Sequence, residues 1–234
     1  NGQSWRQLDA SAWVFLALCG AFLLLPRLLP YVQPAPAPSH APVSVDLLQG
    51  NISQGEKFEL STGIPLALNW YRQQLLASQA QLVITPETAV PLLPLELPTG
   101  YWLSLQQHFA ASKNAALVGL PVGNEADGYA NAVVGLKASK EAVHYAYFKH
   151  HLVPFGEFIP PMFRWFTDLM RIPLGDFSRG QEVQASFDWA GERFAPNICY
   201  EDLFGEELAA RFVDEKTAPT VLVNVSNLAW FGNA

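Results

Sequence analysis

Apolar and polar positions alternate along most of the chain in a way that predicts an α/β domain. Short apolar runs rich in strand-forming residues, such as VSVDLLQG, QLVITPE and AALVGLP, are separated by longer segments with helical periodicity. We expect helices at Leu66–Ala80 and Tyr101–Lys113. Such an alternation of strands and helices is typical of a sheet that helices cover on at least one face.

The second half of the pattern contains more strands. The runs YANAVVGL and AVHYAYF are close together in the sequence, and we expect them to form a hairpin. The strand ERFAPNIC, a short helix and the strand TVLVNVSN follow.

One hydrophobic stretch differs from these runs in length. No charge interrupts ASAWVFLALCGAFLLL, residues 10–25. As a helix it would extend about 24 Å, and four more residues, with Arg27 at the interface, would reach the ~30 Å of a bilayer core. We therefore predict one transmembrane helix with its flank at residues 1–29. A secretory signal peptide is the alternative, because Arg6 precedes the stretch and an APA sequence follows it.

Prolines at alternating positions mark a boundary after this stretch. The sequence PYVQPAPAPSHAP, residues 30–42, predicts an extended, semi-rigid spacer. Residues 43–234 then form the second domain, which is long enough to bury a sizeable core.

Composition and charge exclude several classes of function. The chain is 50% hydrophobic and 15% charged, which indicates a folded protein. Its net charge of −7 argues against nucleic acid as a partner, because the phosphate backbone requires a basic surface. Only two cysteines are present, Cys19 and Cys199, so the sequence offers neither a disulfide framework nor a cysteine-based zinc site.

Three reactive side chains stand at the ends of predicted strands, where loops usually carry the chemistry of α/β folds. Glu87 ends QLVITPE, Lys149 ends YAYFK and Cys199 ends ERFAPNIC. A carboxylate can take the proton of a thiol, a cation can stabilise negative charge, and the thiolate can attack a carbonyl group. A helix that begins after Cys199 should also favour its thiolate.

Each of the three has a structural alternative. Cysteine is among the most buried residue types, so Cys199 can be a small core residue. Glu87 can simply begin a helix, where negative charge suits the helix dipole. Lys149 can belong to a solvated basic turn or, with His150 and His151, to a metal site.

The longer strings around these residues resemble a known superfamily. PE after an apolar strand, K-x-H-L-V-P-F-G-E from Lys149, and C-Y-E from Cys199 together resemble the nitrilase superfamily with its Glu-Lys-Cys triad. HHLVPFGEFIP, FSRG, NICYED and SNLAWFGNA are similar to its apolipoprotein N-acyltransferase branch, and the similarity runs in order from Val43 to the C-terminus. This resemblance implies an αββα sandwich, preceded by a transmembrane helix, on the periplasmic side of the bacterial inner membrane.

The resemblance also implies roles for individual residues. Glu87 becomes the general base, Lys149 the oxyanion stabiliser and Cys199 the nucleophile. The implied supporting residues are Glu157, which orients Lys149 or relays a proton, Tyr200, whose backbone N–H reaches the oxyanion, Glu201, which caps the next helix or braces the site, and Asn131, a polar support.

The apolar segment 158–177 suggests a place for the substrate. We expect it to form a lid or an entry path for acyl chains at the membrane surface, and an amphipathic helix packed on the core is the alternative. The substrate-binding residues we expect are Phe158, Trp165, Phe166 and, in SNLAWFGNA, Trp230.

The implied reaction is an acyl transfer through a thioester, with no metal and no organic cofactor. The donor is a membrane phospholipid and the acceptor is the lipidated N-terminus of an apolipoprotein. A nitrilase-type amidohydrolase with the same triad and a non-catalytic, membrane-tethered binding module remain the alternatives. Because the family has further membrane helices before this region and continues past AWFGNA, we expect the chain to be an internal part of a longer enzyme.

Overall fold

The computed structural model describes residues 10–32, 41–52, 59, 61–138, 145–154, 156–158 and 177–227. The chain divides into two compact units, Asn1–Ala41 and Pro42–Ala234, each of which is described by itself.

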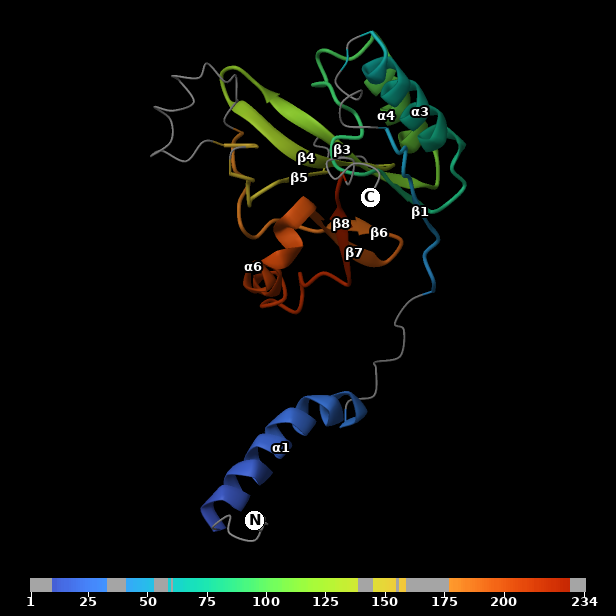
Figure 1. The fold of residues 1–234 in the computed structure, drawn as a ribbon. Helices are drawn as coiled ribbons and strands as arrows, with labels where there is room; N and C mark the ends of the chain where they lie inside the picture. The colour runs from blue at the N-terminus through green and yellow to red at the C-terminus, as the bar shows by residue number, and fades with distance from the viewer. Residues whose placement is uncertain are drawn as a thin grey trace, which may run out of the picture. The chain divides into compact units, whose positions relative to one another are not determined.

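The first unit contains the helix α1 (Ala10–Val32), drawn in blue in Figure 1. A helix is therefore confirmed here, and it extends into the first residues of the predicted spacer. Its predicted crossing of the membrane is not confirmed, because no helix among the described residues combines the length and the hydropathy that a bilayer crossing requires.

The second unit is built on a five-stranded sheet. Its strands lie in chain order, β1 (Val45–Leu47), β2 (Leu82–Ile84), β3 (Ala115–Asn124), β4 (Gly128–Leu136) and β5 (Tyr145–Phe148). The first three strands are parallel, and β3, β4 and β5 are antiparallel. The hairpin that we expected between YANAVVGL and AVHYAYF is confirmed in the pairing of β4 with β5.

A smaller sheet contains the strands β6 (Phe187–Trp189), β7 (Glu192–Ile198) and β8 (Val221–Val225). The strand β7 lies in the middle, antiparallel to β6 and parallel to β8. At its end the chain turns into the 3-10 helix η2 (Cys199–Leu203), which the short helix α6 (Gly205–Ala210) follows.

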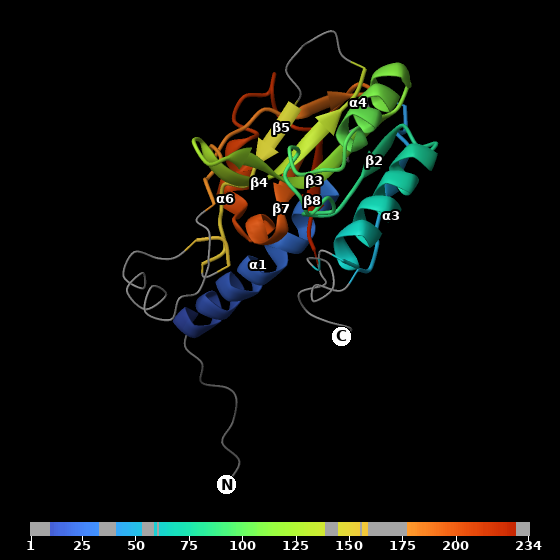
Figure 2. The same cartoon turned by 90° about the horizontal axis from the view of Figure 1, so that it is seen from above.

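The two sheets and the helices form layers. The helices α3 (Gly63–Ala77) and α4 (Tyr101–Ala111) lie on one side of the larger sheet, and the smaller sheet and α6 lie on the other (Figures 1 and 2). The strand β2 and most of β3 and β4 are buried on both faces, as their nearly continuous apolar sequence indicates, whereas the edge strand β1 is exposed. This order of layers agrees with the predicted αββα sandwich.

Side chains of β3 show how the period of two divides the core. Ala116, Val118 and Leu120 pack in the cluster under α3 and α4. Ala115 and Leu117 pack in the second cluster, between the two sheets. The same alternation places Asn131 of β4, Tyr147 of β5 and Lys149 after it on the face toward the end of β7.

The predicted elements differ from the observed ones at their ends. We expected a helix at Leu66–Ala80, whereas α3 begins at Gly63 and ends at Ala77, because its buried face already begins at Ile64. The hairpin between β3 and β4 was not predicted, although the side chain of Asn124 accepts backbone N–H groups of the turn in the manner of an Asx turn. The strand β6 was also missed, since it is only three residues long.

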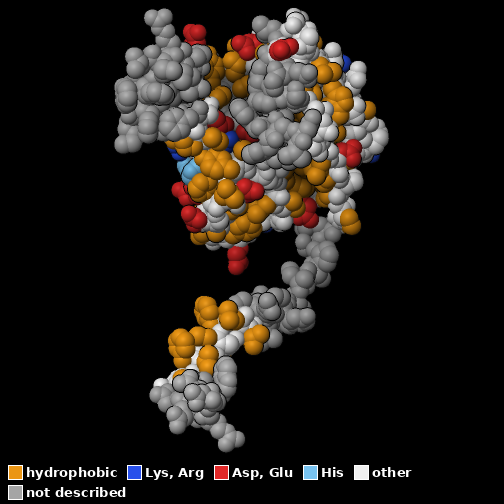
Figure 3. All heavy atoms as spheres, in the orientation of Figure 1, with side chains coloured by type: hydrophobic (Ala, Val, Ile, Leu, Met, Phe, Trp, Pro, Cys, Tyr) orange, Lys and Arg blue, Asp and Glu red, His pale blue; other side chains and the backbone are white. Residues whose placement is uncertain are grey.

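Acidic side chains lie among apolar ones on the face of the second unit that Figure 3 shows, and few lysines or arginines are visible there. This distribution matches the net charge of −7. It gives no support on that face for a nucleic-acid surface, which requires a basic patch.

Replacing Phe187 by alanine should destabilise the packing between the sheets. The ring is fully buried, and a methyl group added at Gly135 in β4 would lie only 2.5 Å from it, so the ring rests directly on the backbone of the larger sheet. We expect Phe187→Ala to lower the free energy of unfolding by about 3–5 kcal/mol in urea denaturation. Leu95→Ala is the control, because this side chain is exposed and should contribute less than about 0.5 kcal/mol. A loss below about 1 kcal/mol for Phe187→Ala would contradict tight packing at this point.

Candidate active site

The structure brings the three predicted reactive residues together from different parts of the chain. Glu87 lies in the turn after β2, Lys149 directly follows β5, and Cys199 is the first residue after β7. The ammonium group of Lys149 is 3.1 Å from Oε1 of Glu87, and both charges act on the Cys199 thiol. Their proximity agrees with the sequence analysis, whereas their catalytic roles remain predictions.

Lys149 is almost fully buried between two carboxylates. Its Nζ lies 2.9 Å from Oε1 of Glu157, in addition to its contact with Glu87. Burial alone would lower the pKa of the ammonium group, but the two carboxylates outweigh this effect and raise the pKa above its ordinary value. Lys149 is therefore a stable cation in this site.

Asn131 on β4 joins the same two carboxylates. Its Nδ2 donates hydrogen bonds to Oε1 of Glu87, at 2.7 Å, and to Oε1 of Glu157, at 3.1 Å. Ionised carboxylates only accept hydrogen bonds, so the amide must present its nitrogen to them. The consequence is that Asn131 Oδ1 is buried with no hydrogen-bond partner among the described residues. The polar support predicted for Asn131 is thus a bridge between two acids.

The outer oxygens of the two carboxylates are held by backbone N–H groups. Oε2 of Glu157 accepts from Val153 at 2.9 Å, within its own loop. Oε2 of Glu87 accepts from Asn227 at 3.4 Å, just after β8. Each acid therefore presents one oxygen to Lys149 and is anchored by the other.

Cys199 adopts a backbone conformation that is unusual for its residue type. Its φ of 59° lies in the left-handed region, which residues with a Cβ rarely occupy. Its carbonyl oxygen accepts a hydrogen bond of 2.7 Å from the side chain of Asn224 on β8. Strained positions of this kind cluster at functional sites, and here the turn leaves the cysteine partly exposed beside Lys149.

The electrostatics of the thiol correct one expectation from the sequence. Burial and the carboxylate of Glu87 raise the pKa of the Cys199 thiol above its ordinary value, although Lys149 and a hydrogen bond from the Tyr200 backbone N–H oppose the rise. The resting thiol is therefore protonated near neutral pH and requires a base, and Glu87 is suitably close.

Glu201 connects the cysteine turn to the lysine loop. Its Oε1 accepts the backbone N–H groups of His150, at 2.7 Å, and His151, at 3.0 Å. Its Oε2 accepts the N–H of Ile198, at 2.6 Å, and the hydroxyl of Tyr147, at 2.9 Å. Glu201 therefore accepts the backbone N–H at the start of η2 and ties the ends of β5 and β7 together.

Sequence reasoning missed the residues behind this carboxylate. The buried guanidinium group of Arg211 lies 4.7 Å from the ring centre of Tyr147 and donates to the carbonyl oxygen of Pro196 at 2.6 Å. Tyr147 in turn donates to Glu201. No local pattern marks these residues, because their partners are distant in the sequence.

Gly119 is a second residue that the sequence analysis missed. Its N–H donates to Thr85 Oγ1 at 2.9 Å, and a Cβ at this position would lie 2.2 Å from the carbonyl oxygen of Pro86. Only glycine allows the turn that carries Glu87 to lie so close to β3. A glycine inside a predicted strand is the signal that could have indicated this close approach.

The alternative of a metal site at the two histidines finds no support. His150 Nδ1 lies 2.8 Å from the carbonyl oxygen of Gly180, and His151 Nδ1 lies 3.1 Å from Glu207 Oε1. The ring of His151 also stacks on that of Phe204, at 3.5 Å between ring centres. Within the described ranges, no group of three or more potential ligands is arranged for a metal ion.

The structure describes only one of the four residues that we expected to bind substrate. Phe158 directly follows Glu157, and its ring lies 4.8 Å from the guanidinium carbon of Arg179. Trp165, Phe166 and Trp230 lie outside the described residues, as does most of the segment that we expected to form a lid.

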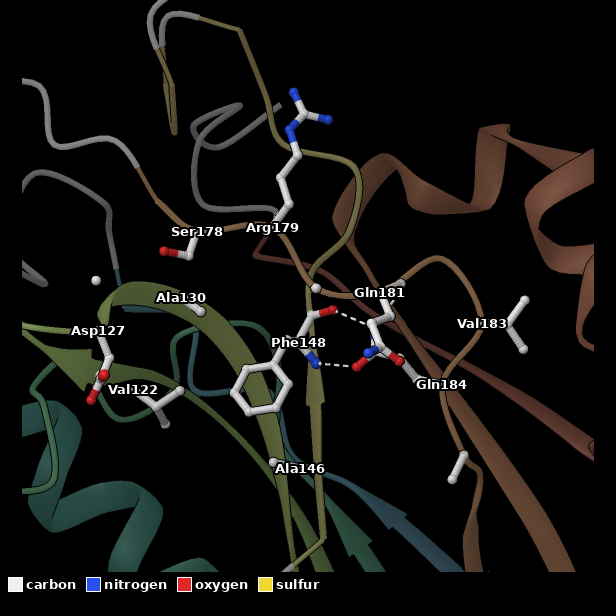
Figure 4. A pocket seen from close by; sticks show the side chains of 14 residues that line it. Val122, Asp127, Ala130, Ala146, Phe148, Ser178, Arg179, Gln181, Val183 and Gln184 are labelled. Carbon is white, nitrogen blue, oxygen red and sulfur yellow. Dashed lines mark hydrogen bonds between the residues drawn. The ribbon is translucent and has the colours of Figure 1, made fainter.

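A cavity of about 760 Å³ lies on the other face of β4 and β5 (Figure 4). Its floor includes Val122, Ala130, Ala146 and Phe148, which alternate with the side chains that reach the triad. The side chain of Gln184 covers the edge of β5 here, accepting from the N–H of Phe148 at 2.9 Å and donating to its carbonyl oxygen at 2.7 Å. This cavity is therefore separate from the triad.

The amino-acid sequence is similar to those of known proteins. Residues 45–234 match the family model described as carbon-nitrogen hydrolase. The chain is 54% identical to a protein named apolipoprotein N-acyltransferase from Verminephrobacter eiseniae, over 98% of this chain and 44% of that protein. A protein of the same name from Ralstonia nicotianae is 46% identical, over 84% of this chain and 37% of that protein. The chain thus spans less than half the length of these curated relatives.

A solved structure supports the fold. A protein from Xanthomonas campestris, described as a CN-hydrolase superfamily member with an arsenic adduct in its active site, matches with a TM-score of 0.54 and 21% identity. The match covers 79% of this chain and 64% of that one. The family model spans most of the sequence, and the layers around Glu87, Lys149 and Cys199 agree with it, so the chain belongs to the carbon-nitrogen hydrolase family.

Proposed function

We propose that this chain carries the catalytic domain of an apolipoprotein N-acyltransferase. The observation that carries the proposal is the buried cluster of Lys149 with Glu87 and Glu157 beside a partly exposed Cys199. The name of the relative with 54% identity supports the choice of reaction, since it shares nearly all of this chain. The substrates follow from that name, and the chemistry follows from the cluster.

In the first step, Glu87 takes the proton of the Cys199 thiol, and the thiolate attacks the carbonyl carbon of a phospholipid ester. Lys149 stabilises the oxyanion that forms on the carbonyl oxygen. The C–O bond to the glycerol then breaks, and the departing alkoxide takes the proton back from Glu87. The products are a lysophospholipid and a thioester on Cys199.

In the second step, the free α-amine of the lipidated N-terminal cysteine of an apolipoprotein attacks the thioester. The amine loses a proton to Glu87, the C–S bond breaks, and the thiolate recovers a proton. The acyl chain leaves as an amide. Because Asn131 and Glu157 hold Glu87 and Lys149 in fixed positions, both steps use the same arrangement without reorganising buried charges.

The membrane relation of the protein is part of the same proposal. We infer that α1 associates with the bacterial inner membrane and that the catalytic unit faces the periplasm, where lipidated substrates would be available. The inference is supported by large apolar side chains that α1 exposes, among them Trp13, Phe15 and Phe22.

An acyl adduct on Cys199 is the direct test of the first step. We expect intact-mass spectrometry to detect one acyl group after incubation of the purified protein with phospholipid vesicles alone, and none with Cys199→Ala. Glu87→Gln and Lys149→Met should each slow adduct formation by about a hundredfold or more, since they remove proton transfer and oxyanion stabilisation. Near-normal transfer by Cys199→Ala would exclude this nucleophile, and release of free fatty acid without any acceptor would favour the amidohydrolase alternative.

The pH dependence of thiol alkylation tests the electrostatics of the site. Cys199 is the sole cysteine of a Cys19→Ala variant, so its reaction with iodoacetamide can be followed alone. Because burial and Glu87 raise the thiol pKa, the rate should still increase with pH above the ordinary thiol range. Glu87→Gln removes a negative charge and should shift the midpoint to lower pH, whereas Lys149→Met removes a positive charge and should shift it to higher pH. Shifts of the same sign in both variants would contradict the arrangement described above.

Vesicle flotation tests the association of α1 with lipid. We expect the protein to float with phospholipid vesicles, and the double variant Phe15→Asp, Phe22→Asp to bind on the order of tenfold or more weakly, because two exposed aromatic side chains are lost. Leu95→Asp, at an exposed position of the second unit, is the matched control and should bind as the unaltered protein does. Equal flotation of the double variant and the unaltered protein would exclude α1 as the anchor.

A further inference from the structure

The catalytic cluster contains more acidic than basic groups. The carboxylates of Glu87 and Glu157 surround the single ammonium group of Lys149. A donor that carries a phosphate group would bring a further negative charge to this site. The repulsion is strongest where protein replaces water, so a second cation near the entrance would favour such a donor.

Arg179 is placed by backbone contacts on both sides of it. The N–H of Ser178 donates to the carbonyl oxygen of Tyr129 at 2.6 Å. The N–H of Gly180 donates to the carbonyl oxygen of Lys149 at 2.9 Å. The loop is thus fixed to β4 on one side of Arg179 and to the catalytic lysine on the other.

The side chain of Arg179 is exposed. Its guanidinium carbon lies 4.8 Å from the ring centre of Phe158, the residue after Glu157, and this contact orients the side chain. Among the residues that the structure describes, no carboxylate lies within ion-pair distance of Arg179. Arg179 also lines the cavity described above, and in Figure 4 its side chain extends away from Phe148 and Gln184.

The phenol of Tyr200 links Arg179 to the thiol. Burial raises the pKa of this phenol, and the charges of Lys149 and Arg179 oppose the rise, while those of Glu157 and Cys199 add to it. The hydroxyl itself is fixed by a hydrogen bond of 2.7 Å to the carbonyl oxygen of Leu152. The charges of Arg179 and of Cys199 therefore both act on the phenol of Tyr200, whose ring centre also lies 5.9 Å from Nζ of Lys149.

We propose that Arg179 binds the phosphate group of the acyl donor at the entrance to the Cys199 site. A guanidinium group suits this role, because its N–H groups match two phosphate oxygens at once. The exposed guanidinium also compensates the surplus of acidic groups around Lys149. This inference rests on the proposed function for its substrate, whereas the anion site itself does not depend on acyl transfer.

Two alkylating reagents of similar size test the anion site without any lipid. In the Cys19→Ala background, the rate constants of Cys199 with anionic iodoacetate and with neutral iodoacetamide are compared at one pH. Arg179→Gln should lower the ratio of the iodoacetate rate constant to the iodoacetamide rate constant on the order of threefold to tenfold. The iodoacetamide rate constant itself should stay within about twofold of the parent value. Added salt should reduce the difference. Lys216→Gln, which removes an exposed lysine in the loop after α6, is the matched control and should leave the ratio unchanged.

An unchanged ratio in Arg179→Gln would overturn the proposal. A parallel loss of both rates together with a lower midpoint in urea would also overturn it, since Arg179 would then be a structural residue. Inorganic phosphate should slow the iodoacetate reaction of the parent protein, and Arg179→Gln should abolish this protection. Absence of any protection would likewise count against a phosphate site.

Acyl transfer then distinguishes a lipid phosphate from free phosphate. With phospholipid as donor, Arg179→Gln should raise KM about tenfold with little change in kcat, and Arg179→Lys should restore part of the difference. With a diacylglycerol donor, which lacks the phosphate, the variant and the parent should have the same KM. Equal increases of KM for both donors would assign the anion site to free phosphate and overturn its role in donor recognition. If no variant shows acyl transfer while the reagent ratio still falls, the anion site stands and the proposed function fails.

Discussion

An ammonium group inside a protein must be surrounded by groups that replace its water, and this requirement organises the second unit. Lys149 is almost fully buried, and the acids that neutralise it come from two other places in the chain. Leaving such a charge unpaired would be strongly destabilising, so the turn after β2, the end of β5 and the loop at Glu157 must assemble together. Asn131 completes the arrangement, and as a consequence its Oδ1 is buried without a hydrogen-bond partner among the described residues.

Cys199 is tied to this charge cluster through backbone hydrogen bonds. Glu201 binds the N–H groups of His150 and Ile198, so the residue after Lys149 and the residue before Cys199 share one carboxylate. Tyr147 donates to this carboxylate, and Arg211 packs against the ring of Tyr147. The distance between cation and thiol is therefore set by a rigid connection between two sheets, in the manner that preorganised sites require.

Several parts of the site could be predicted from the sequence because they follow strand ends. Glu87, Lys149 and Cys199 each end an apolar run, and motifs identified Glu157, Asn131 and Glu201 beside them. The raised pKa of the Cys199 thiol could not be predicted from the sequence, because it depends on burial and on distances to charges rather than on the helix that follows. The left-handed backbone of Cys199 and the contact of Arg211 with Tyr147 leave no local trace, since both are imposed by tertiary packing.

The contact of Gln184 with Phe148 has a consequence beyond the site. The strand β5 is at the border of the larger sheet, and an open border offers N–H and carbonyl groups to any passing chain. At Phe148 both groups are already occupied by the amide of a side chain, which imitates the neighbouring strand. A second molecule therefore finds no free backbone at Phe148, so the segment next to Lys149 is protected from edge-to-edge aggregation.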